Sequence, residues 1–284
     1  MANTAKEFRN KLEQEGVHHS FSIAFSMRCG STVLSELLSR SGVGSPTEYF
    51  QYPYERNIFL SDATATGFTT GFDSLIKKNS PGGIFGSKMT HDHRAHLDDF
   101  LRKSFPDFVT LDDVLPNHKW IFVDRKDVIA QAISLYVAER VGVWHVVAGE
   151  DRAAPYDEVE YDFFDVLSKL MILLANNANW QLYFLTLGIV PLHLHYEDLC
   201  DDTDTVFKNI FDYLGVSHTR VPALKTESEG SLQKISGNHN ELYSSLKKRF
   251  SDDFLNIGQS DDLERLGSAL PVWGRFFSER QWNC

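Results

Sequence analysis

Residues 21–42, FSIAFSMRCGSTVLSELLSRSG, decide the fold of this chain. The run FSIAFS at 21–26 is short and contains aromatic and β-branched side chains, which is typical of a strand. The turn MRCGST follows directly, and VLSELLSRSG then has apolar residues at helical spacing, with Gly42 as a stop signal. The stretch therefore predicts a strand, a glycine turn and a helix in direct succession.

This strand-to-helix order recurs along the chain. KWIFVD at 119–124 predicts a second strand, which leads into residues 125–144, where apolar positions again have helical spacing. Three further elements are expected: a helical region over about 157–187, a strand over 189–196, and a helix over 201–214 closed by Gly215. Strands that alternate with helices indicate an α/β fold, with a central parallel sheet and helices on both faces.

Two long stretches have weaker patterns. Residues 43–87 are rich in Gly, Thr, Ser, Tyr and Phe and show little periodicity. We expect loops and short helices there, over the face of the sheet that holds the active site. Residues 216–284 are polar, with helices expected near 239–250 and 260–268.

The size of the chain bounds its domain organisation. A chain of 284 residues with 42% hydrophobic side chains can bury one full core. We therefore expect a single domain over 1–284, with its core at about 20–215 and a C-terminal extension after it.

The composition limits the partners and the compartment. A formal net charge of −11 argues against broad binding to nucleic acid or anionic lipid, because those partners need a basic face. Cys29, Cys200 and Cys284 are odd in number and lack Cys-x-x-Cys spacing, so neither a disulfide framework nor a structural zinc site is expected. No stretch has the apolar core of a signal peptide or the length of a transmembrane helix. We expect a cytoplasmic protein.

The turn after the first strand has the features of an anion site. Gly30 permits a tight turn, and the N–H groups of Gly30, Ser31 and Thr32 lie where a helix begins, which favours a negative ligand. Arg28 adds a positive charge. By itself, the motif fits an ordinary strand-to-helix turn with serine as the helix cap better than an anion site.

Two other phosphate chemistries lack the residues that they need. A P-loop NTPase has a lysine before the Ser/Thr pair, and here Gly30 stands in that place. A cysteine phosphatase needs an arginine six residues after its nucleophile, and that position holds Ser35. Cys29 is therefore interpreted as a packing residue rather than a nucleophile.

A second pair of residues suits phosphate binding. Arg125 ends the second strand, and Ser134 follows it by nine positions in the next helix. A guanidinium and a hydroxyl so placed can hold one phosphate from two sides. Taken alone, Arg125 fits a surface or salt-bridged position equally well.

Three blocks of sequence together are distinctive. SMRCGSTVLSELLSRSGVGSPTEYFQYP, FGSKM and VDRKDVIAQAISLYVAERVGVW resemble the bacterial sulfotransferases of the trehalose 2-sulfotransferase and lipopolysaccharide sulfotransferase family, which depend on 3'-phosphoadenosine-5'-phosphosulfate (PAPS). The resemblance covers roughly residues 20–215. It implies a P-loop nucleotide-kinase-like sulfotransferase fold, sulfuryl transfer from PAPS to a hydroxyl of a carbohydrate-containing acceptor, no metal, and a homodimer.

The resemblance also assigns roles to residues. It implies a 5'-phosphosulfate loop formed by Arg28, Cys29, Gly30, Ser31 and Thr32. Arg125 and Ser134 match the residues that hold the 3'-phosphate. Glu48, in SPTEYFQ, matches the family's general base, and Lys88, in FGSKM, matches a lysine that stabilises the transferring sulfuryl group or orients the acceptor. The chain departs from the wider cytosolic sulfotransferases, which usually have a lysine in the loop and an Arg-to-Ser spacing one residue shorter.

Further residues are weaker candidates. Four aromatic residues fit an acceptor groove and core packing equally well: Tyr49, Phe50, Tyr52 and Tyr54. Trp144 is a candidate to flank the ligand. A cofactor-covering loop is a hypothesis for Lys225, Gln233 and Lys234.

Two histidine clusters are candidates for metal sites. HDHRAH at 91–96 is close to a binuclear hydrolase motif, but Ala95 occupies the position of its aspartate and a helical stretch follows. His91, His93 and His96 are interpreted as surface or acceptor-site residues. His193 and His195 share one face of a strand, and we expect them to be buried and hydrogen-bonded.

Two alternatives to a sulfotransferase remain open from the sequence. One is a small-molecule kinase on the same fold, and the other is a nonenzymatic protein that binds PAPS or another nucleotide. The acceptor is not identified, because its specificity is expected to lie in residues 43–87 and 145–160.

Overall fold

A computed structural model describes most of the chain. The described residues are 4–51, 65–144, 146–147, 159–217, 232–233 and 240–256. The contacts divide the chain into two compact units: 1–126 with 175–225, and 127–174 with 226–284. The single-domain organisation expected from the sequence stays a prediction.

The first unit is built on a parallel sheet of four strands in the order β2-β1-β3-β5. These strands are β1 (His19–Phe25), β2 (Ile84–Met89), β3 (His118–Asp124) and β5 (Leu192–His195). Every neighbouring pair is parallel, which confirms the predicted α/β fold with a central parallel sheet. The carboxyl ends of all four strands therefore meet at one edge.

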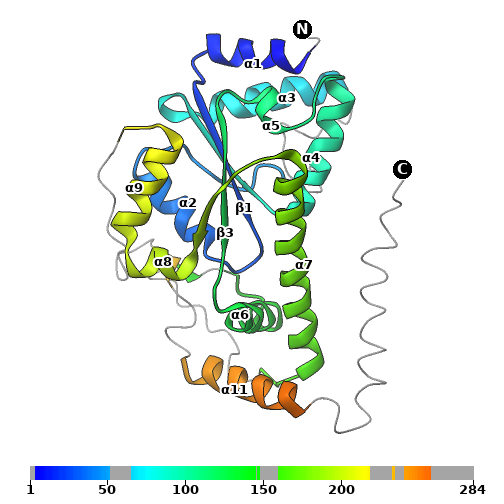
Figure 1. The fold of residues 1–284 in the computed structure, drawn as a ribbon, viewed down its shortest axis with the longest axis vertical. Helices are drawn as coiled ribbons and strands as arrows, with labels where there is room; N and C mark the ends of the chain where they lie inside the picture. Colours follow the sequence, from blue (N-terminus) through cyan, green and yellow to red (C-terminus); the bar gives the residue numbers. More distant parts are fainter. Residues whose placement is uncertain are drawn as a thin grey trace. The chain divides into compact units, whose positions relative to one another are not determined.

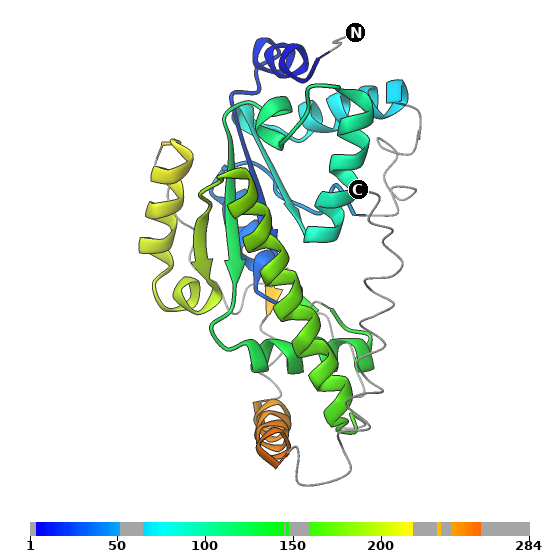
Figure 2. The ribbon, with the colours of Figure 1, turned by 45° about the vertical axis from the view of Figure 1, so that its right-hand side comes forward.

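Side chains of successive strand residues alternate between two cores, as the strand period requires. Phe21 and Ile23 of β1 join Ile121 of β3 on one face, under α2 (Ser31–Arg40) and α9 (Thr203–Leu214). On the other face, Trp120 and Phe122 of β3 are covered by helices from the N-terminal part of the chain and by the end of one later helix. These are α1 (Ala5–Gln14), α3 (Ala65–Lys78), α4 (His91–Ser104), α5 (Leu111–Val114) and the last part of α7 (Phe163–Leu187). Both views show α9 and α4 on opposite sides of the strands (Figures 1 and 2).

The expectation of loops and short helices over 43–87 was wrong for its second half. That half contains the 14 residues of α3, a short 3-10 helix at Pro81–Gly83 and most of β2. A helical period is in fact present, because Phe68, Phe72, Leu75 and Ile76 share the buried face of α3. The sequence pattern of β2 is weak as a strand signal because it contains Gly86, and glycine has a low strand propensity. A Cβ at Gly86 would lie 2.6 Å from the Phe21 ring, so a larger residue here would force that ring to move.

The second unit is mainly helical. It contains α6 (Val128–Val141), the first part of α7, α11 (Asn240–Asn256), and an antiparallel pair formed by β4 (Val146–Val147) and β6 (Leu232–Gln233). The Asp127 side chain caps α6 by accepting from the Ala130 N–H (3.0 Å), and it also pairs with Lys247 of α11. The helix predicted near 239–250 is confirmed as α11, whereas 260–268 lies outside the described residues.

His118, the first residue of β3, is buried and neutral. Its Nδ1 lies 3.0 Å from Ser20 Oγ, and because that hydroxyl donates to the Pro116 carbonyl, the imidazole is the donor. Its Nε2 is buried without a hydrogen-bond partner among the described residues. Burial lowers the pKa of His118 to about 3.

We therefore predict that His118 makes the protein sensitive to mild acid. The unfolded chain takes up a proton near pH 6.5 and the folded one only near pH 3, so stability is complete above pH 6.5 and is lost as the pH falls. Between pH 7 and pH 5 this residue alone should lower the free energy of unfolding by about 2 kcal/mol. Urea unfolding of His118→Gln should show a shallower pH dependence, while the exposed-site control His18→Gln should match wild type.

Candidate active site

The turn between β1 and α2 has an unusual backbone. Arg28 has φ 66° and Gly30 has φ 87°, so two left-handed residues occur within three positions. Left-handed residues among right-handed ones turn successive N–H groups towards one side, which forms an anion-binding concavity. Gly30 is the N-cap of α2 and, as a glycine, has no side chain to cap this end. The alternative in which serine caps the helix is therefore wrong, because Ser31 is already helical.

The ring of Tyr196 packs against this turn at Gly30. It follows β5 directly, as the first residue of α8 (Tyr196–Asp201). A Cβ added to Gly30 would lie 2.1 Å from Cδ2 of the Tyr196 ring. The same ring faces the guanidinium of Arg125 at 4.9 Å. Gly30 is thus required both by its φ and by this contact.

Lys88 joins the turn to the candidate base. It lies near the end of β2, and its side chain is only 6% exposed. Its Nζ donates to Thr32 Oγ1 at 2.8 Å and lies 3.2 Å from Glu48 Oε1. A buried ammonium thus contacts a residue of the predicted loop on one side and the predicted base on the other.

A short backbone pairing places Glu48 there. Thr47 forms a parallel bridge with Ser87, and the Lys88 N–H donates to the Thr47 carbonyl at 2.9 Å. The segment before Glu48 therefore runs beside the end of β2 like an additional strand. Nothing in the local sequence around residue 48 predicts this pairing.

Arg125 lies against the same turn. It follows β3, its side chain is 14% exposed, and one terminal nitrogen lies 3.5 Å from the Arg28 carbonyl. Its Nε lies 3.6 Å from Glu197 Oε1, and the other Glu197 oxygen accepts from the Lys126 N–H at 3.0 Å. Tyr196 and Glu197 were not singled out from the sequence, although residues that follow a parallel strand are where ligands bind in α/β sheets.

The structure thus brings together most of the predicted site. Arg28 to Thr32, Glu48, Lys88 and Arg125 all lie at the carboxyl edge of the first unit's sheet. Ser134 is half-buried in the middle of α6, in the second unit, and its pairing with Arg125 stays a prediction.

Cys29 packs into the core under the turn. It is fully buried among the apolar side chains below α2. Burial raises the pKa of its thiol to about 11, against hydrogen bonds from Ser31 that lower it. The thiol is therefore protonated at neutral pH, which supports the interpretation of Cys29 as a packing residue.

Comparison with known families bears on this arrangement. Residues 20–245 match the family model described as Stf0 sulphotransferase, which covers most of the chain. The chain belongs to this sulfotransferase family. Its loop, its Glu48–Lys88 pair and Arg125 all fall within the matched residues.

Two relatives are catalogued under one activity. Trehalose 2-sulfotransferase from Mycobacterium tuberculosis (strain ATCC 35801 / TMC 107 / Erdman) is 24% identical over 245 residues, which cover 72% of this chain and 88% of the relative. Trehalose 2-sulfotransferase from Mycolicibacterium smegmatis (strain ATCC 700084 / mc(2)155) is 25% identical over 233 residues, which cover 69% and 84%. In the described part of this sulfotransferase, no helix is long and apolar enough to cross a bilayer.

The histidines of 91–96 lie on the first turns of α4. His91 Nε2 is 3.1 Å from Arg94, and its ring meets Trp180 edge-on. Burial lowers the pKa of His93, while the charge of Glu48 acts in the opposite direction, so His93 lies near the candidate base. Among the described residues, His91, His93 and His96 do not form a metal-ligand cluster.

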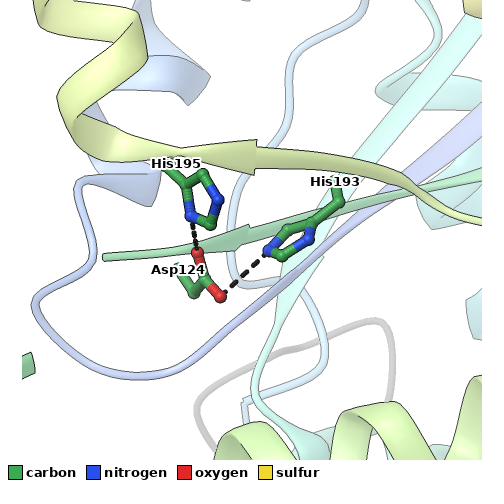
Figure 3. Close-up of side chains that lie close together, drawn as sticks. All are labelled: Asp124, His193 and His195. Carbon is green, nitrogen blue, oxygen red and sulfur yellow. Dashed lines mark hydrogen bonds and ion pairs between the residues drawn. The ribbon is translucent and has the colours of Figure 1, made fainter. Parts of the chain in front are cut away.

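His193 and His195 differ from the expectation in one respect. Both are hydrogen-bonded, His193 Nε2 to Asp124 Oδ2 at 2.9 Å and His195 Nδ1 to Asp124 Oδ1 at 2.5 Å (Figure 3). They are not buried, since their side chains are 44% and 34% exposed. β5 is an edge strand, so its end is covered less than the sequence pattern suggested.

The aromatic candidates near Glu48 are packing residues where they are described. Phe50 is fully buried, and Tyr49 stacks on Phe85 and donates to the Ser45 carbonyl. Trp144 is 42% exposed. The other candidates, Tyr52, Tyr54, Lys225, Lys234 and the side chain of Gln233, lie outside the described residues.

We predict that alanine is far less tolerated at Gly30 than at Gly42. Gly42 also has positive φ (75°) but has nothing within 4 Å of an added Cβ, so Gly42→Ala should cost about 1 kcal/mol of unfolding free energy. Gly30→Ala adds the clash with Tyr196 and should cost about 1–3 kcal/mol more in urea unfolding.

A double mutant isolates the contact. In a Tyr196→Ala background, Gly30→Ala should cost about as much as Gly42→Ala, because only the φ strain remains. Equal losses for the two glycines in the wild-type background would show that the Tyr196 ring does not press on the turn.

Proposed function

We propose that the chain transfers the sulfuryl group of PAPS to a hydroxyl of a carbohydrate or carbohydrate-containing acceptor. The observation that carries the proposal is the Lys88 ammonium, which lies between Thr32 of the turn and the carboxylate of Glu48. In this arrangement the buried Lys88 ammonium contacts both the anion-binding turn, through Thr32, and the proposed proton acceptor, Glu48.

The residues at the sheet edge suit a polyanionic donor. Two cations, Lys88 and Arg125, lie at this edge, each beside one carboxylate, Glu48 or Glu197, in a chain that is acidic overall. The left-handed turn and the backbone N–H groups at the start of α2 add donors that need no side chain.

Each residue has a defined task in the proposed reaction. PAPS, when bound, supplies the sulfuryl group: its bond from sulfur to the phosphate oxygen breaks, with the electron pair left on that oxygen, as the acceptor oxygen bonds to sulfur. Glu48 takes the proton of the acceptor hydroxyl, which makes the oxygen a better nucleophile. Lys88 stabilises the charge that develops near Thr32, and the turn holds the 5'-phosphate.

Arg125 and Ser134 are proposed to hold the 3'-phosphate, which distinguishes PAPS from ordinary adenylates. Arg125 has the bidentate fork that suits this group. In this proposal Glu197 shares the guanidinium with the phosphate or releases it. No observation favours a kinase, because Gly30 stands where its P-loop lysine would be.

The acceptor class rests on the relatives. Both are named trehalose 2-sulfotransferase, so trehalose is the first acceptor to test. A homodimer and a cytoplasmic location belong to the same proposal.

Calorimetric titration with 3'-phosphoadenosine-5'-phosphate, the desulfated product, tests the donor site. Wild type should bind it at least about 30-fold more tightly than AMP, because the 3'-phosphate adds charge-assisted hydrogen bonds of about 2 kcal/mol. Arg125→Ala should lose a similar factor. The adjacent Lys126→Ala is the matched control and should bind normally, since Lys126 is half-exposed and pairs with Asp198. Equal affinity for AMP would contradict the proposal.

Glu48→Gln should lose turnover without losing the donor. With labelled PAPS and trehalose, or another carbohydrate from a panel, kcat should fall by about 100-fold to 10,000-fold because the proton acceptor is gone. The calorimetric affinity for the desulfated product should change little. Glu36→Gln, on α2 and paired with Arg40, is the control. Wild-type kcat in Glu48→Gln would rule out this residue as the base.

A further inference from the structure

Asp124, His193 and His195 form a cluster that sulfuryl transfer does not use. His193 and His195 come from β5, and Asp124 stands opposite His195 in the neighbouring strand β3. Figure 3 shows the two imidazoles on either side of the carboxylate, both directed towards its oxygens. One nitrogen of each ring and a carboxylate oxygen lie within 4.8 Å of one another.

The scaffold holds these donors in place. Residues two apart on a strand project from the same face, and the parallel register fixes Asp124 beside His195. The Phe122 ring stacks on His193 at 4.9 Å, which restricts its rotation. Ligands fixed on strands are placed more precisely than ligands on loops.

The charge balance of the cluster favours a cation. The Asp124 side chain is only 13% exposed, and in the described part of the chain its ion-pair partners are these two histidines and no lysine or arginine. A carboxylate in such a position is stabilised by a bound positive ion.

We propose that Asp124, His193 and His195 bind a divalent transition-metal ion. Two imidazole nitrogens and one carboxylate oxygen suit Zn²⁺, Co²⁺, Ni²⁺ or Cu²⁺ better than Mg²⁺ or Ca²⁺, which prefer oxygen ligands. The exposed side of His193 leaves room for water to complete the coordination.

Binding an ion needs a rearrangement of the three side chains. Ligands about 2.1 Å from a tetrahedral ion lie about 3.4 Å apart, so the N–O contacts of 2.5 and 2.9 Å must open, and the donor atoms, now spread over as much as 4.8 Å, must close around the ion. Each imidazole binds through the nitrogen that now faces Asp124 and carries its proton on the other nitrogen. The ion takes no part in sulfuryl transfer, and the proposal does not rest on the proposed function.

Titration of the chelator-treated full chain with Co²⁺, followed by its visible ligand-field absorption, tests the proposal. We expect one Co²⁺ per chain, displaced by Zn²⁺. His193→Gln and His195→Gln should each weaken binding by about 100-fold or more, since loss of a ligand exceeds the 10-fold to 100-fold cost of losing its hydrogen-bond support. Zn²⁺ should raise the melting temperature of wild type and of neither variant.

The chain offers matched controls. His18→Gln removes an exposed histidine at the other end of the sheet, and His96→Gln removes one from the run that the sequence suggests as a metal motif. Both should bind Co²⁺ as wild type does. Absent binding, or binding unaffected in His193→Gln and His195→Gln, would overturn the proposal and leave a hydrogen-bonded cluster only. Loss of binding in His96→Gln alone would assign the ion to α4 instead.

Discussion

The parallel pairing of β1 with β2 and β3 is the constraint on which the site depends. It aligns Ile23 with both Lys88 and Ile121, so that the residues after β1, near the end of β2 and after β3 reach the same edge. The turn, Lys88 and Arg125 come from points up to about a hundred residues apart in the chain. An antiparallel arrangement would place some of them at the opposite end of the sheet, some 20 Å away.

Around this edge, opposite charges are interleaved rather than separated. Lys88 has Glu48 beside it and Arg125 has Glu197, while backbone donors of the turn stand between the two pairs. A buried cation with a carboxylate partner is less costly than one left alone, so the protein can keep these charges ready before a ligand arrives. The same proximity supports a proton acceptor at Glu48 and a phosphate ligand at Arg125.

The end of β5 completes this edge in a way that the family motifs do not describe. Tyr196 lies against both Gly30 and the guanidinium of Arg125, and so connects the turn after β1 to the segment after β3. One residue earlier, His195 and its neighbour His193 bond to Asp124. The end of β5 and the start of α8 thus contribute contacts that the motifs alone do not indicate.

The sequence by itself determined the fold class, the turn at 28–32 and the candidates Glu48, Lys88 and Arg125. Hydrophobic period, glycine position and contiguous motifs are local properties, and they are enough to specify strands, helices and a parallel order. Only the tertiary structure decided that β2 lies beside β1, that Lys88 lies between Thr32 and Glu48, and that Tyr196 and Glu197 lie against Arg125. It also decided which histidines come together, at Asp124 and not in the run 91–96. These features depend on pairings between distant segments, and Gly86 shows why they escape a local pattern: its role is set by the ring of Phe21, more than sixty residues earlier.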